Sequence, residues 1–162
     1  MHKLALSIVL TSQGISFLHA GTEFLRSKKD VENSYNKPDS INAIDWNLKT
    51  INNDVFNYVQ QLISLRKEHP AFRMQTAVQI QRNLSFLPSP RGIIGYRLNG
   101  SALNDIWKDI QVWFNGNATD QTLPPEWTAG YKTAVLNNEF VATASGGQQV
   151  IKGYSCIILY RD

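Results

Sequence analysis

The character of the sequence changes near residue 72, and this change limits the folds that the chain can adopt. Before it, apolar residues recur at helical spacing between Val55 and Arg66, and Lys3–Thr11 is apolar nearly all round. After it, short segments rich in β-branched and aromatic residues are separated by turns that contain proline and glycine. The sequence therefore predicts an α+β fold, with a helical part at residues 1–72 and an antiparallel β-sandwich at residues 73–162.

The helical part is expected to contain, in this order, a helix, a strand, a long loop and a second helix. Gly14 stops the first helix, and Ile15–Ala20 lacks clean alternation, which is typical of a parallel strand buried on both faces. The second helix is expected to be capped by Asn52 or Asn53 and to end at His69-Pro70. A helix that is apolar on all sides and a doubly buried strand need neighbours that this sequence does not supply. We therefore expect the chain to be the C-terminal piece of a larger protein.

The β part is expected to contain six short strands. They are Ala77–Arg82, Leu84–Leu87, Ile93–Leu98, Ile110–Asn115, Tyr131–Leu136 and Tyr154–Tyr160. Trp107, Trp113 and Trp127 suggest either a sugar-binding stripe or core packing, and the alternation around Trp113 favours core packing. The single cysteine, Cys156, lies in an apolar run and is expected to be a small core residue.

Composition excludes several partners. The formal net charge is only +3 and the basic residues are scattered, so no nucleic-acid partner is predicted. The apolar run after Met1 imitates a signal peptide, but it is too short to span a membrane and no small-residue cleavage site follows. We therefore expect a buried helix and no membrane partner, and the localisation stays open. The three histidines lack metal-ligand spacing, so no metal and no cofactor are predicted.

The loop from Asn33 to Trp46 carries the functional signal. It is long for a connection inside a compact domain and consists mostly of amides, hydroxyls, carboxylates and aromatic rings. Amides and carboxylates hydrogen-bond sugar hydroxyls, and aromatic faces pack on sugar rings. The loop therefore suggests a sugar-binding surface; the alternative is a solvated connector.

Four segments resemble type I pullulanases, debranching enzymes of the α-amylase superfamily (glycoside hydrolase family 13). Met1–Arg26 resembles the last turn of their catalytic (β/α)8 barrel, and Asn33–Trp46 resembles the loop after the eighth strand. Leu65–Arg73 is similar to the end of the eighth helix, and Gly100–Asn115 is similar to a strand pair of the C-terminal all-β domain. The resemblance implies a retaining glycosidase that acts on α-1,6-glucosidic linkages in pullulan and branched starch, with an α-glucan as its partner.

The same resemblance implies that the catalytic carboxylates lie before residue 1. No residue of this chain is predicted to be catalytic, and the isolated chain is expected to be inactive, so whether it is itself an enzyme stays open. Substrate contacts are expected from Arg26 and from four residues of the loop: Ser34, Tyr35, Asn36 and Asp39. Arg26 could instead have a surface role, and Asp39 could organise a turn. Asn42, Asp45 and Trp46 are expected to hold the loop onto the barrel.

Two further hypotheses follow. The chain could instead be a non-catalytic carbohydrate-binding or interaction module. A set of apolar residues lacks barrel neighbours and is expected to pack back on the sandwich or against another copy of the chain, with self-association as the result. These residues are Leu4, Leu6, Ile8, Val9, Leu10 and Phe17.

Overall fold

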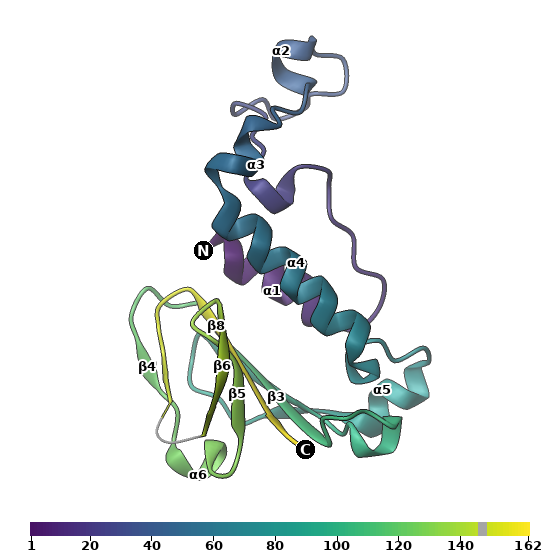
Figure 1. Ribbon diagram of the computed structural model, residues 1–162, viewed down its shortest axis with the longest axis vertical. Coiled ribbons are helices and arrows are strands. Elements are labelled where there is room, and N and C mark those ends of the chain that lie inside the picture. The colour runs from purple at the N-terminus through teal and green to yellow at the C-terminus, as the bar shows by residue number, and fades with distance from the viewer. Residues whose placement is uncertain (146–148) are drawn as a thin grey trace.

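The computed structural model describes residues 1–145 and 149–162, and it arranges them in layers. Helices α1 and α4 lie side by side on one face of a six-stranded sheet, and a two-stranded sheet lies on the other face (Figure 1). The segment between α1 and α4 extends away from both sheets to the top of the molecule. The α+β class and the antiparallel β part predicted from the sequence are confirmed.

The helical elements cluster before residue 84. They are α1 (His2–Thr11), the 3₁₀ turn η1 (Thr22–Phe24), α2 (Asp39–Asn42), α3 (Asn47–Ile51), α4 (Asn53–Glu68), η2 (Pro70–Phe72) and α5 (Ala77–Asn83). Helix α4 begins after Asn52 and ends before Pro70, as expected. The Asn52 side chain does not cap the helix, because its Nδ2 donates to the carbonyl of Phe24 at 3.1 Å instead.

Two predicted strands are wrong. Ile15–Ala20 is extended but pairs with no strand in the described part of the chain, and Ile15 and Phe17 are 101% and 78% exposed. A strand exists only where a neighbouring backbone completes its hydrogen bonds, which the segment's own residues cannot do. Ala77–Arg82 lies in α5, because Thr76 and Gln79 form a reciprocal capping box that starts a helix.

The main sheet is antiparallel throughout, in the order β1-β2-β3-β8-β5-β6. Its strands are β1 (Leu84–Leu87), β2 (Ile93–Leu98), β3 (Asp109–Asn115), β5 (Lys132–Leu136), β6 (Glu139–Ser145) and β8 (Ser155–Arg161). The small sheet pairs β4 (Gln121–Thr122) with β7 (Val150–Ile151), and two short helical turns, η3 (Ser101–Leu103) and α6 (Pro125–Thr128), connect strands. The five remaining predicted strands are confirmed to within one residue at each end, whereas β4, β6 and β7 were not predicted.

Side chains alternate along β3 and divide the interior into two cores. Ile110, Val112 and Phe114 face the helices and pack with residues of α1 and α4, such as Leu62. Trp113 is fully buried on the opposite face, beneath the small sheet. The core on the helix side therefore contains residues from both sides of residue 72, and it includes Cys156 as the sequence predicted. Of the α1 residues expected to lack neighbours, Leu4, Leu6 and Leu10 are buried in this core, whereas Ile8 and Val9 are 40% and 36% exposed.

Candidate functional site

The segment that leads into the loop begins at a tight turn fixed by Gly21 and Arg26. Gly21 has a φ of +92°, which favours glycine, and its carbonyl accepts from the Arg26 N–H at 2.9 Å. A Cβ at position 21 would lie 2.7 Å from Arg26 Cβ, so the arginine stem packs directly on the glycine. The Gly21 N–H donates to Glu23 Oε2 at 3.0 Å. The turn therefore sets the direction in which the chain leaves the extended segment before it.

Arg26 connects the backbone that precedes the loop to the backbone within the loop. Its Nη1 donates to the carbonyl of Ala20 at 3.0 Å, and its Nη2 donates to the carbonyl of Asn42. Its Nε is buried and has no hydrogen-bond partner among the described residues. The arginine thus uses two of its donors to hold backbone carbonyls, one before the loop and one within it, which is the role of a positioning residue.

Asn42 is the centre of the loop's internal hydrogen bonds. Its Nδ2 donates to the carbonyls of Ser34 and Lys37, both at 2.7 Å, and its Oδ1 accepts from Lys28 Nζ at 2.8 Å. Desolvation, followed by the positive charge of Arg26, lowers the pKa of Lys28 from its ordinary value. One amide therefore connects two points of the loop to each other and to Lys28 before it, in the way expected for a residue that holds the loop in shape.

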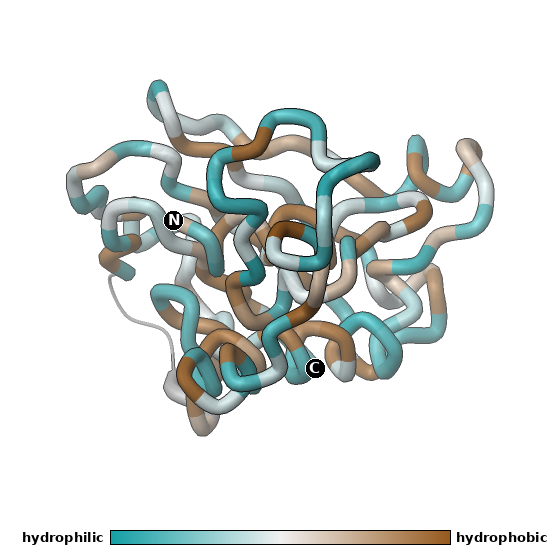
Figure 2. Tube along the Cα trace, turned by 90° about the horizontal axis from the view of Figure 1, so that it is seen from above, coloured by the Kyte–Doolittle hydropathy of each residue, from teal (hydrophilic) through white to brown (hydrophobic). Residues whose placement is uncertain are grey.

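The residues predicted to contact substrate divide into two groups. Tyr35 is 84% exposed, and Asn36 and Asp39 are also exposed, at the outer end of the loop and at the start of α2. Ser34 is half-buried, and its carbonyl accepts from both Asn42 and the Lys37 N–H. Viewed from above, this end of the molecule is mostly hydrophilic (Figure 2). The structure thus brings Tyr35, Asn36 and Asp39 to the surface and places Arg26 and the Ser34 carbonyl beneath them.

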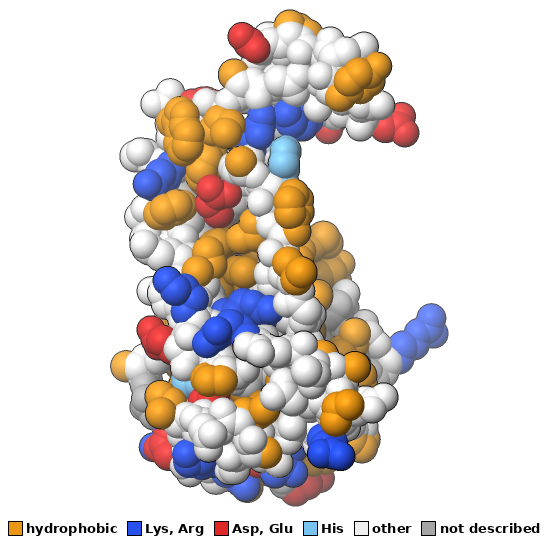
Figure 3. Space-filling view, turned by 90° about the vertical axis from the view of Figure 1, so that its right-hand side faces the viewer, with side chains coloured by type: hydrophobic (Ala, Val, Ile, Leu, Met, Phe, Trp, Pro, Cys, Tyr) orange, Lys and Arg blue, Asp and Glu red, His pale blue; other side chains and the backbone are white. Residues whose placement is uncertain are grey.

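The loop ends on Asp45 and Trp46. Asp45 Oδ1 accepts from the N–H of Asn47 at 3.0 Å and so starts α3. The Trp46 ring lies 5.8 Å from the ring of Phe24, which is only 1% exposed, although Trp46 itself is 66% exposed. Both ends of the loop are therefore fixed, and the outer segment between them overhangs a notch in the molecular surface (Figure 3).

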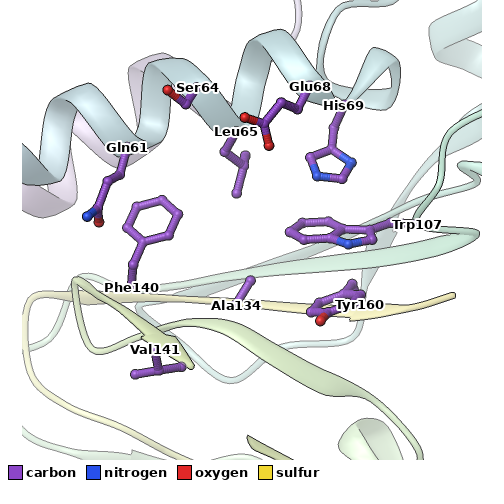
Figure 4. Close-up of a pocket in the computed structure, with 10 residues that line it drawn as sticks. All are labelled: Gln61, Ser64, Leu65, Glu68, His69, Trp107, Ala134, Phe140, Val141 and Tyr160. Carbon is purple, nitrogen blue, oxygen red and sulfur yellow. The ribbon is translucent and has the colours of Figure 1, made fainter. Parts of the chain in front are cut away.

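A second cleft, of about 320 Å³, lies between α4 and the main sheet (Figure 4). Three rings are stacked along it: the centroids of His69 and Trp107 are 3.7 Å apart, and those of Trp107 and Tyr160 are 4.1 Å apart. His69 Nδ1 lies 2.7 Å from Asp105 Oδ1. Sequence reasoning missed this pair, because 36 residues separate its members and no local pattern marks either one.

No group of three or more His, Cys, Asp or Glu side chains within residues 1–145 and 149–162 could hold a metal ion. In the same part of the chain, no helix is long and apolar enough to cross a membrane.

Comparison with known proteins assigns the family. Residues 80–126 match the family model described as the all-beta domain of pullulanase. A pullulanase of Bacillus subtilis is 47% identical over 110 residues, which are 68% of this chain and 15% of that protein. The chain belongs to the pullulanase family. The family match covers the region from α5 to α6, which includes the centre of the main sheet.

Solved pullulanases have the same fold over almost the whole chain. The pullulanase from Bacillus acidopullulyticus is 39% identical with a TM-score of 0.87 and covers 99% of this chain and 20% of its own. A pullulanase from Anoxybacillus sp. LM18-11, solved in complex with maltotetraose, is 37% identical with a TM-score of 0.88 and covers 99% of this chain and 23% of its own. The chain therefore spans less than a quarter of the length of these pullulanases.

Proposed function

We propose that this chain is the C-terminal part of a debranching glycoside hydrolase that acts on α-1,6-glucosidic linkages of pullulan and branched starch. Residues 1–72 would be the end of the catalytic (β/α)8 barrel, and residues 73–162 would be the C-terminal β domain. Similarity to pullulanases over both parts supports this division. The catalytic carboxylates would come from elsewhere in the enzyme, since retaining glycosidases need two carboxyl groups about 5 Å apart across the scissile bond.

The observation that carries the proposal is the contrast between the outside and the inside of the loop. Arg26 and Asn42 hold its base and centre through hydrogen bonds to four backbone carbonyls. The side chains of Tyr35, Asn36 and Asp39 nevertheless remain exposed at its outer end. A binding residue needs a fixed backbone and a free side chain, because ordering on binding then costs less affinity. We assign these three side chains to one wall of the α-glucan site, with Arg26 and Ser34 supporting them from behind.

A hybrid enzyme tests the proposal. Residues 1–162 would replace the matching segment of the Bacillus subtilis pullulanase, and reducing-sugar release from pullulan would be measured. We expect an active hybrid in which Tyr35→Ala raises KM several-fold, since the exposed ring is lost as a sugar-packing surface. Phe86→Ala is the matched control, because Phe86 is an equally exposed aromatic residue (74%) on the edge strand β1. A folded hybrid without activity, or one indifferent to Tyr35→Ala, would contradict the proposal.

The isolated chain offers two further tests. On pullulan it should release no reducing sugar, and clear turnover would show that the catalytic carboxylates lie within these residues. It should also self-associate, because Ile8, Val9, Ile15 and Phe17 expose apolar surface, and hydrophobic side chains gather beside the notch (Figure 3). Light scattering that reports a monomer at all concentrations would refute self-association.

A further inference from the structure

A cleft of about 270 Å³ lies on the face of the main sheet opposite to α1 and α4. Its floor comes from β2 and β3. In the register of these two strands, Arg97 lies opposite Gln111 and Gly95 lies opposite Trp113. These residues alternate with Tyr96 and Val112, which face the helices. One wall is α6, which carries Glu126 and Trp127. The cleft is therefore separated by the whole thickness of the sheet from the helical part and from the loop that carries Tyr35.

Trp127 is held in a fixed orientation at this cleft. Its ring stacks on that of Trp113 with a centroid distance of 5.4 Å and an interplanar angle of 5°. Gln111 Nε2 donates to the Trp127 carbonyl at 3.0 Å, and Gln111 Oε1 accepts from Trp113 Nε1 at 2.9 Å. Trp113 can lie flat here only because position 95 is glycine: a Cβ there would lie 2.3 Å from the Trp113 ring. Trp113 is completely buried, whereas Trp127 is half-buried and lines the cleft.

Charged groups of both signs stand around this indole. Arg97 donates through Nε and Nη2 to the two oxygens of Asp109, at 2.7 and 2.6 Å, while 52% of its side chain stays exposed. The guanidinium of Arg161 lies 4.0 Å from the centre of the Tyr131 ring and covers it. Glu126 is exposed in the first turn of α6. A rigid indole flanked by one free carboxylate and two guanidinium groups suits a neutral polyol better than an anion, because donors and acceptors are both available.

We propose that this cleft is a second carbohydrate site, which binds one or two glucosyl units of an α-glucan on the β domain, away from the loop. Trp127 is the packing surface for the sugar ring, and Arg97 and Glu126 bind its hydroxyls. The volume is below the range of about 300–1,000 Å³ typical of small-molecule pockets, so affinity in the millimolar range is expected. The identity of the sugar rests on the proposed function, but the existence of the site does not.

The test is a titration of the 162-residue chain with maltohexaose, followed by intrinsic tryptophan fluorescence. We expect a saturable change with a millimolar Kd in the wild-type chain. Trp127→Ala should remove it, and Glu126→Ala should weaken it at least three-fold. Glu126 is exposed, and so its replacement leaves the fold intact even if Trp127→Ala does not. Trp46→Ala is the control, because Trp46 is an exposed tryptophan (66%) that does not line this cleft, and its replacement should leave the Kd unchanged.

Two comparisons distinguish sugar binding at this cleft from sugar binding at the loop. Tyr35→Ala removes the exposed ring of the loop and should have no effect on this titration. Cellohexaose, which has β-1,4 linkages, should bind at least ten-fold more weakly than maltohexaose. The proposal is overturned if folded Trp127→Ala and Glu126→Ala chains titrate like the wild type, if Tyr35→Ala alone removes the signal, or if cellohexaose binds equally well. A hybrid enzyme that is inactive on pullulan would contradict the loop function and would leave this site standing.

Discussion

The imidazole Nδ1 of His69 lies 2.7 Å from Oδ1 of Asp105, and the two side chains are only 3% and 0% exposed. His69 follows the last residue of α4, and Asp105 lies in the turn before β3. The same carboxylate accepts from the backbone N–H groups of Ala71 at 3.0 Å and Trp107 at 2.9 Å. One buried side chain therefore connects the end of the helical part to the sheet.

This connection predicts a measurable loss of stability in Asp105→Asn. The amide keeps the size of the carboxylate but loses its charge and one acceptor, which leaves a buried donor unpaired. We expect the free energy of unfolding to fall by about 1–3 kcal/mol, the usual cost of an unsatisfied buried group. Urea unfolding followed by fluorescence and by circular dichroism should show the loss with both probes, because helices and sheet share one core. Asp30→Asn, at an exposed loop position, is the control and should be neutral.

Low pH should remove the stabilisation that the Asp105 carboxylate contributes. Burial raises the pKa of Asp105, but the hydrogen bonds from His69, Ala71 and Trp107 lower it more, so it lies below its ordinary value of 3.8. The unfolded chain then binds more protons than the folded chain between the two pKa values. The stabilisation from Asp105 is therefore complete above about pH 5 and is lost as the pH falls through the lowered pKa.

The unfolding free energies of the wild type and of Asp105→Asn should consequently converge as the pH falls below about 4. Urea unfolding at a series of pH values measures this. Two curves that stay parallel down to the acid limit would show that Asp105 does not carry the effect.

Much of the sheet was predictable because its signals are local. Leu84–Leu87 and Ile93–Leu98 are strands at the predicted bounds, since alternation and turn residues mark them within a few positions. The strand predicted at Ile15–Ala20 was wrong for the opposite reason: its pattern is typical of a strand that needs partners on both sides, and no such partners are among the described residues. Apolar and polar residues alternate in Ala77–Arg82 as in a strand, but the capping box of Thr76 and Gln79 stabilises a helix there.

The candidate site was predictable in outline only. Composition identified the loop as a polar surface and Asn42 as a residue that holds it, and the hydrogen bonds of Asn42 agree. Composition could not show that Arg26 binds the loop's own backbone, since that depends on Ala20 and Asn42 meeting in space. The cleft at Trp127 was hidden for the same reason. The three tryptophans of the β part form no single stripe, because Trp107 packs on the helix side of the sheet and Trp113 and Trp127 on the other.

The thiol of Cys156 should react only slowly with thiol reagents in the folded chain. It is completely buried in the core on the helix side, and burial raises the pKa of its thiol, so the reactive thiolate is scarce. Ellman's reagent should modify it slowly in buffer and rapidly in concentrated urea. A Ser89→Cys variant adds a thiol at an exposed position and should react with one equivalent at once. Fast reaction of the wild-type thiol in buffer would mean that this core opens far more readily than its packing indicates.

The loop should lose its shape when Asn42 is replaced by alanine. The change removes both donors to the Ser34 and Lys37 carbonyls and the acceptor for Lys28, while the cores beneath remain intact. We expect trypsin to cut at Lys28-Lys29 several-fold faster, with little change in the melting temperature, because cleavage needs local opening rather than global unfolding. Asn36→Ala is the matched control, since Asn36 is an exposed amide of the same loop and its loss should not change the rate. Equal cleavage rates for Asn42→Ala and the wild type would show that the fixed base lies elsewhere, and Arg26 would be the next residue to replace.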